Sequence, residues 1–71
     1  MYKSFDELKE ALRGTLSSPV VDSLPSVLSP STQKMLCRKD CGDVAQIIMC
    51  SISMIDAGSM KTMDELVRSR L

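Results

Sequence analysis

The amino-acid sequence predicts an all-α protein, a compact bundle or array of four to five short helices around a buried central helix at about Val44–Ala57. Helix-start patterns recur along the chain, and apolar residues repeat at helical spacing. No segment shows the alternation of a half-buried strand or the turn signal of a hairpin. With 71 residues, the chain is expected to form one domain over residues 1–71.

The first and last helices are predicted by capping boxes, in which a hydroxyl residue at the N-cap is followed three residues later by a carboxylate. Ser4 and Glu7 form the first box, and the apolar stripe behind it predicts a helix over about Phe5–Arg13. Thr62 and Glu65 form the second box and predict the last helix of the chain.

The stretch Thr15–Thr32 combines the composition of a linker with helical spacing. It is rich in Ser and Pro, yet its valines and leucines repeat at helical intervals. We expect a short helix that begins at Pro19, is capped by Ser18, and is broken or kinked near Pro25, because proline inside a helix costs about 3 kcal/mol. Another helix is expected over about Pro30–Lys39, followed by a turn into the central helix.

The segment Val44–Ala57 predicts the central helix, with Asp43 as its N-cap and Gly58 as its C-terminal stop. At 100° per residue, its apolar side chains cover an arc of roughly 220°, much wider than the stripe of an ordinary surface helix. We therefore expect this helix to be enclosed on nearly every side, with Met49 and Met54 filling the core. A buried strand is the alternative, but the length and the caps favour a helix.

Composition argues against several classes of function. Histidine is absent, so no Ser-His or Cys-His pair can form, and we expect neither enzymatic activity nor catalytic residues. Nine basic and nine acidic residues give a net charge of zero, which does not favour non-specific binding to nucleic acid or anionic membranes. The chain shows no signal peptide and no apolar stretch long enough to span a bilayer, so we expect a cytoplasmic protein that makes no membrane contact.

The three cysteines, Cys37, Cys41 and Cys50, are too few and too unevenly spaced for common cysteine sites. An odd number does not give a closed disulfide framework. A structural zinc site needs four ligands, and without histidine the fourth would have to be an aspartate or come from another chain. We interpret the cysteines as buried free thiols, with no metal and no cofactor. A thiol switch at Cys41, near Lys39 and before a helix start, is a minor alternative.

These observations lead to the hypothesis of a small helical regulator, inhibitor or adaptor. It would dock an apolar patch on another protein, on a second copy of itself as a dimer, or on both. The central helix requires burial nearly all round, whereas only short, interrupted helices are available to cover it. The residues expected at the interface belong to the central helix and to the chain end that follows it: Ile47, Ile48, Met54, Ile55, Met60, Met63 and Val67.

The alternative hypothesis is a DNA-binding transcriptional regulator that uses the basic cluster Lys34, Arg38 and Lys39. Lys34 and Arg38 share a helix face, and a helix, a turn and the central helix follow one another as in a helix-turn-helix. A recognition helix, however, exposes polar side chains to base edges, and the segment Val44–Met54 has almost none to offer. Nucleic-acid binding is therefore the weaker expectation.

Overall fold

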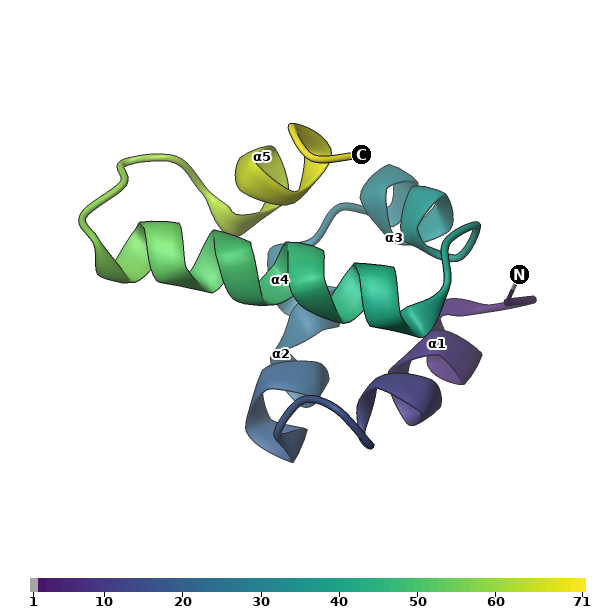
Figure 1. The fold of residues 1–71 in the computed structure, drawn as a ribbon. Coiled ribbons are helices and arrows are strands. Elements are labelled where there is room, and N and C mark those ends of the chain that lie inside the picture. The colour runs from purple at the N-terminus through teal and green to yellow at the C-terminus, as the bar shows by residue number, and fades with distance from the viewer. Residues whose placement is uncertain (1) are drawn as a thin grey trace.

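The computed structural model describes residues 2–71, and every regular element in that range is an α-helix. The five helices are α1 (Phe5–Leu12), α2 (Ser18–Val27), α3 (Pro30–Leu36), α4 (Cys41–Asp56) and α5 (Met63–Arg68). Helix α4 runs across the middle of the molecule, with α3 and α5 on one side and α1 and α2 on the other (Figure 1). The predicted fold class is therefore confirmed. Within residues 2–71, no helix combines the length and the apolar character that crossing a membrane would require.

The first and last helices begin where their capping boxes predict. Ser4 Oγ accepts a hydrogen bond from the Glu7 N–H at the start of α1, at 3.4 Å. Thr62 Oγ1 accepts one from the Glu65 N–H at the start of α5, at 3.2 Å. Each hydroxyl pairs a backbone donor that the first turn of a helix leaves free, which explains why these two starts can be located from sequence.

Helix α2 continues through Pro25 instead of breaking there. Proline has no N–H to donate to the carbonyl of Val21, four residues earlier. The disruption falls near the end of the helix, however, and the Leu28 N–H still donates to the Leu24 carbonyl at 3.0 Å. Burial of Val21, Leu24 and Leu28 in the core offsets the missing hydrogen bond, so of the expected break or kink, the break does not occur.

Two boundaries before α4 differ slightly from the prediction. The N-cap of α2 is Ser17, one residue ahead of the expected Ser18. Helix α3 begins at Pro30 as predicted, but it ends at Leu36, because a turn leads from there into α4. The expected continuation to Lys39 is therefore wrong, and the residues of that turn lie outside both helices.

Helix α4 is longer at its start than predicted. It begins at Cys41, with Asp40 in the N-cap position that we assigned to Asp43. At the other end, Gly58 adopts a φ of 100°, a left-handed conformation that glycine takes without steric cost. The N–H groups of Gly58 and of the next residue donate back to carbonyls of the last turn, as in a Schellman motif, so the predicted stop is confirmed.

The core is aliphatic and receives side chains from every helix. Helix α4 packs against both α1 and α5, which places it at the centre of the contacts. Ser51 is also buried there, and its hydroxyl donates to the Ile47 carbonyl at 2.9 Å, so this oxygen is not left without a partner. The buried apolar residues are Leu8, Leu12, Leu16, Val21, Leu24, Leu28, Leu36, Val44, Ala45, Ile48, Leu66 and Val67.

The expectation that the central helix is enclosed on nearly every side is wrong. Its buried residues lie on one face, and residues 53–58 are all exposed. Met49 and Met54 are 49% and 40% exposed, so they do not fill the core as predicted. The reason is length: α4 has 16 residues, and the other helices have 6 to 10. Sixteen residues make a helix about 24 Å long, more than such short helices can cover.

A charge-assisted hydrogen bond joins the start of α5 to the start of α3. The Asp64 carboxylate accepts from the Ser29 backbone N–H at 2.9 Å, across 35 residues of sequence. This bond, with help from the hydroxyl of the buried Thr32, lowers the pKa of Asp64 because both donors favour its charged form. Arg68, 3.9 Å away on α5, adds a weaker attraction of the same sign.

Ile48 is expected to be one of the side chains on which folding depends, since it is fully buried on the inner face of α4. The substitution Ile48→Ala should lower the free energy of unfolding by about 2–5 kcal/mol, because it leaves a cavity. The neighbouring change Met49→Ala, at a site 49% exposed, should cost less than about 1 kcal/mol. Urea unfolding followed by circular dichroism measures both, and equal losses would contradict this core assignment.

The lowered pKa of Asp64 makes stability depend on pH. The charged carboxylate stabilises the fold above the unfolded pKa of about 3.9, and this contribution is lost as pH falls through the lower folded pKa. Asp64→Asn should therefore cost roughly 1 kcal/mol at pH 7 and less at pH 2, because the wild-type carboxylate takes up its proton as pH falls through the folded pKa. Urea titrations at both pH values test this, with the exposed Asp56→Asn as control. A cost that does not change with pH would contradict the proposed role of the charge.

Candidate interaction surface

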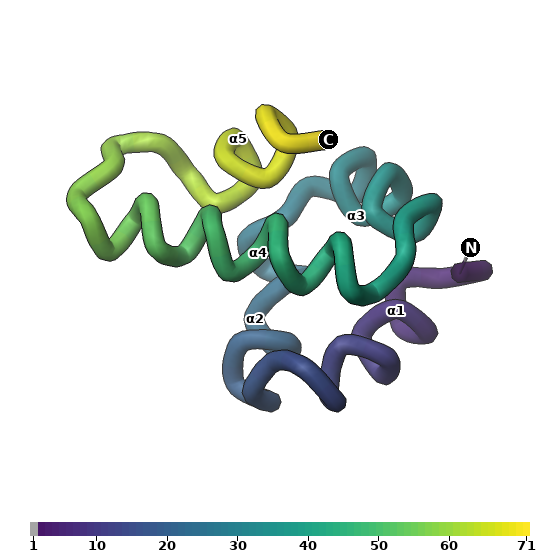
Figure 2. The backbone as a smooth tube through the Cα atoms, in the orientation of Figure 1, coloured from purple at the N-terminus to yellow at the C-terminus, as the bar shows by residue number. Residues whose placement is uncertain are grey.

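The C-terminal end of α4 projects from the body of the molecule. Figure 2 shows that the last part of α4 and the loop that follows it extend beyond α2 and α5. The chain then returns to form α5. We call residues 53–60 the exposed end of α4, because all of them except the half-buried Ser59 are exposed. Three of its side chains are large and apolar, namely Met54, Ile55 and Met60.

Ile55 points in the same direction as the core residues of α4 but is only partly covered. It lies eleven residues after Val44, which at 100° per residue places the two only about 20° apart around the helix axis. Val44 is fully buried, whereas Ile55 is 39% exposed. The apolar stripe of α4 therefore continues past the end of the core, and its last position faces outward because no other helix reaches it.

The two methionines of the exposed end have different surroundings. The Sδ atom of Met54 lies 3.4 Å from the Arg70 guanidinium, which brings the C-terminal residues against this side of α4. Met60 lies in the loop and is 98% exposed, so it contacts almost nothing within the chain. Unbranched thioether side chains adapt to surfaces of different shape, which suits both residues to contact with a partner.

The structure divides the seven residues that the sequence predicts for an interface. Met54, Ile55 and Met60 are exposed and belong to one end of the molecule. Ile47 and Met63 are half-buried against the core. The remaining two, Ile48 and Val67, are fully buried and are not accessible to a partner in this fold.

Met49 is an exposed apolar residue that sequence reasoning placed in the core. Around the helix axis it lies within about 60° of Gln46 and Ser53, which are both exposed. The polar residues beside Met49 on the helical wheel indicate that it lies on the exposed side of α4. The wide apolar arc predicted for this helix includes Met49 and hides that indication. Met49 belongs to the outer face of α4 and not to the exposed end.

The basic cluster of the alternative hypothesis lies on α3 and the turn after it. Lys34 and Arg38 are exposed, and Lys39 is half-buried. None of the three forms an ion pair with another residue in the range 2–71. Their charges therefore remain available to an external anion.

Helix α4 does not offer the surface of a DNA-recognition helix. Its N-terminal part, which would enter the major groove, exposes Gly42, Asp43 and Gln46. A carboxylate at that position would face the phosphate backbone and repel it. Only Gln46 has the amide group that suits contact with a base edge. The order of helix, turn and helix is thus present, but the chemistry of the second helix disfavours DNA.

The cysteines lie in three different positions and are all half-buried free thiols. Burial is the main influence on Cys37 and raises its pKa, so this thiol stays protonated near neutral pH. Among residues 2–71, no group of three Cys, Asp or Glu side chains is arranged to hold a metal ion. The described part of the chain thus offers no preformed set of metal ligands.

Comparison of the chain with protein-family models, with curated proteins and with solved structures finds no match. No relative therefore suggests an activity, a ligand or a partner for this protein. Any function assigned to it has to follow from its own surface, where the main features are the exposed apolar end of α4 and the unpaired cations around α3.

Proposed function

We propose that this chain is a small non-enzymatic protein that acts by protein–protein contact, as a regulator, inhibitor or adaptor, and that it self-associates. The observation that carries the proposal is Ile55: the stripe that forms the core continues onto a helix end that is only partly covered. An apolar side chain that continues the core stripe without a facing helix is typical of a contact with another chain.

Burial of the exposed end of α4 by a partner would be favourable in free energy. Fully burying an aliphatic or methionine side chain contributes about 1.5–3 kcal/mol. Met54, Ile55 and Met60 are 40%, 39% and 98% exposed, so a partner could recover part of this contribution from each of them. For a chain of 71 residues, whose own core is small, such a gain is a large fraction of the total stability.

Charges near the exposed end of α4 favour a second copy as one partner. Asp56, Lys61 and Arg70 lie on or beside this end, and none of them has an ion-pair partner among residues 2–71. In a twofold dimer, each copy presents the same surface to the other. An acidic residue of one copy can then meet a basic residue of the other, so the apolar contact would carry a complementary charged rim.

The residue types support a non-enzymatic role in the cytoplasm. The chain has no histidine, which removes the usual general base for a serine or cysteine nucleophile. Its three cysteines are free, as expected for a protein kept in a reducing compartment. Neither property depends on the identity of the partner.

Self-association through the exposed end of α4 is tested with two lysine substitutions on the same helix. Ile55→Lys places a charge on the partly covered continuation of the core stripe, whereas Ser53→Lys places the same charge on the polar side. The wild type and Ser53→Lys should sediment as dimers at high micromolar concentration. Ile55→Lys should be monomeric, because a charge at an apolar contact has to be desolvated.

Circular dichroism spectra and unfolding midpoints of both variants show whether the fold is kept. A wild type that is strictly monomeric at high micromolar concentration would contradict self-association. Dimers of equal stability in all three proteins would contradict the placement of the contact at Ile55. Analytical ultracentrifugation distinguishes these outcomes.

A DNA-binding regulator that uses Lys34, Arg38 and Lys39 is the second candidate, supported by the fact that none of these cations has an ion-pair partner within residues 2–71. If it is correct, duplex DNA should be retarded in a gel at low salt. Its affinity should fall about 40-fold between about 50 and 200 mM salt, because three phosphate contacts release counterions with a log–log slope of about −2.7. No retardation at low salt would remove this candidate.

A further inference from the structure

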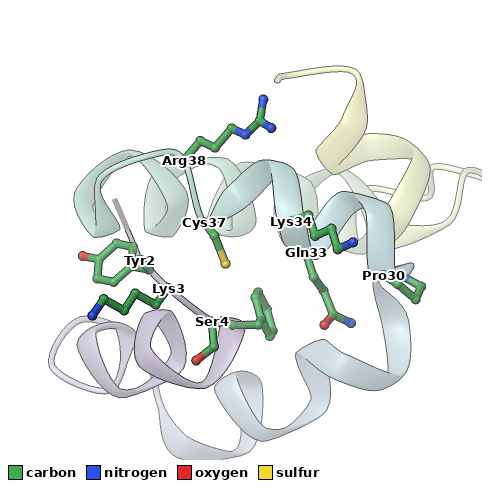
Figure 3. Close-up of a pocket in the computed structure, with 9 residues that line it drawn as sticks. Tyr2, Lys3, Ser4, Pro30, Gln33, Lys34, Cys37 and Arg38 are labelled. Carbon is green, nitrogen blue, oxygen red and sulfur yellow. The ribbon is translucent and has the colours of Figure 1, made fainter.

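A cavity of about 480 Å³ lies between the N-terminal segment and α3. This volume is within the range of pockets that hold small molecules, roughly 300–1,000 Å³. Figure 3 shows side chains from the two segments arranged around it. The lining residues are Tyr2, Lys3, Ser4, Phe5, Pro30, Gln33, Lys34, Cys37 and Arg38.

Hydrogen bonds hold both walls of the cavity in place. The Tyr2 N–H donates to the Cys37 carbonyl at 2.9 Å, which fixes the N-terminal segment against the end of α3. On the other wall, the Gln33 side chain donates to the Leu28 carbonyl at 2.9 Å, which anchors α3 to the end of α2. A cavity held in this way exists before any ligand arrives, and binding does not have to pay for ordering its walls.

The cavity collects the only two aromatic residues of the chain. Tyr2 and Phe5 are both half-buried, so part of each side chain is still accessible. Cys37 directs its sulfur toward the space between the lining side chains (Figure 3), and the raised pKa of this thiol keeps it uncharged. These groups offer a flat apolar body the kind of contact that aromatic rings favour.

The charged residues that line the cavity are all basic. Lys3, Lys34 and Arg38 line it, none of them forms an ion pair within residues 2–71, and no lining residue is acidic. The nearest carboxylate shown by the hydrogen bonds belongs to Glu7, which accepts the Lys3 backbone N–H at 2.9 Å. A lysine ammonium binds a carboxylate as a point charge, and a guanidinium farther away adds to the positive potential at the cavity.

We propose that this cavity binds a small organic anion, a carboxylate carried on a planar apolar body. The body packs against Tyr2 and Phe5, and the carboxylate lies at the rim beside Lys34, while Arg38, whose guanidinium points away from Cys37 in Figure 3, adds a longer-range attraction. Both halves of the ligand are needed, because exposed cations alone bind anions weakly in water. This site lies on α3 and the N-terminal segment, apart from the exposed end of α4, so it does not depend on the proposed protein contact.

The proposal is tested with 2-naphthoate and its uncharged analogue 2-naphthamide, which share the same apolar body. Each compound is titrated into the full-length ¹⁵N-labelled protein, and amide shifts are followed by NMR. With 2-naphthoate, saturable shifts are expected at residues 2–5 and 33–38. 2-Naphthamide should shift the same amides with an affinity about tenfold lower, because it lacks the charge.

The double variant Lys34→Gln/Arg38→Gln separates charge from shape. Both side chains are exposed, so the fold should be kept, which circular dichroism verifies. The variant should lose about tenfold in affinity for 2-naphthoate and bind 2-naphthamide unchanged. The matched control Lys61→Gln removes an exposed cation far from the cavity lining and should change neither affinity.

Three results would overturn the proposal. The first is the absence of saturable shifts with 2-naphthoate up to the millimolar range. The second is equal affinity for 2-naphthoate and 2-naphthamide in the wild type, which would show that the cations take no part. The third is a set of shifts confined to residues 53–60, which would place the compound on the exposed end of α4. None of these results affects the proposed self-association, which is tested separately with Ile55→Lys.

Discussion

The length of α4 is the constraint from which the rest of the structure follows. It has 16 residues in a chain whose other helices have 6 to 10, so the N-terminal part of α4 can be packed and its C-terminal end cannot. Val44 and Ile48 lie in the core on the packed part, and Ile55 continues the same stripe with only partial cover. One helix thus provides both the centre of the fold and an exposed apolar end.

The features that sequence predicts well are those decided by neighbouring residues. Ser4 and Thr62 begin helices because their hydroxyls pair donors only three residues away, and Gly58 ends α4 because of its own backbone conformation. Apolar periodicity likewise identifies most of the core. Of the residues proposed for an interface, Met60 and Ile55 are exposed, Met60 in the loop after α4 and Ile55 in the last turn of that helix.

The features that sequence misses depend on distant parts of the chain. Whether Pro25 breaks α2 depends on how firmly the residues around it are buried, and whether the last turns of α4 are covered depends on the reach of other helices. The cavity forms because Tyr2 is bonded to Cys37, and the pairing of Asp64 with Ser29 spans 35 residues. The spacing of residues along the sequence does not indicate which distant segments contact each other. For this reason neither the cavity nor the hydrogen bond between Asp64 and Ser29 could be predicted.

The two candidate surfaces occupy opposite ends of the molecule. The exposed end of α4 lies at one side of Figure 1, and the N-terminal segment with α3 lies at the other. Their chemistry also differs, since Met60 and Ile55 offer apolar contact, whereas Lys34 and Arg38 offer positive charge. A partner that covers one surface therefore leaves the other accessible. Because α4 is a continuous helix between them, a protein of this size has room for two separate contacts without a second domain.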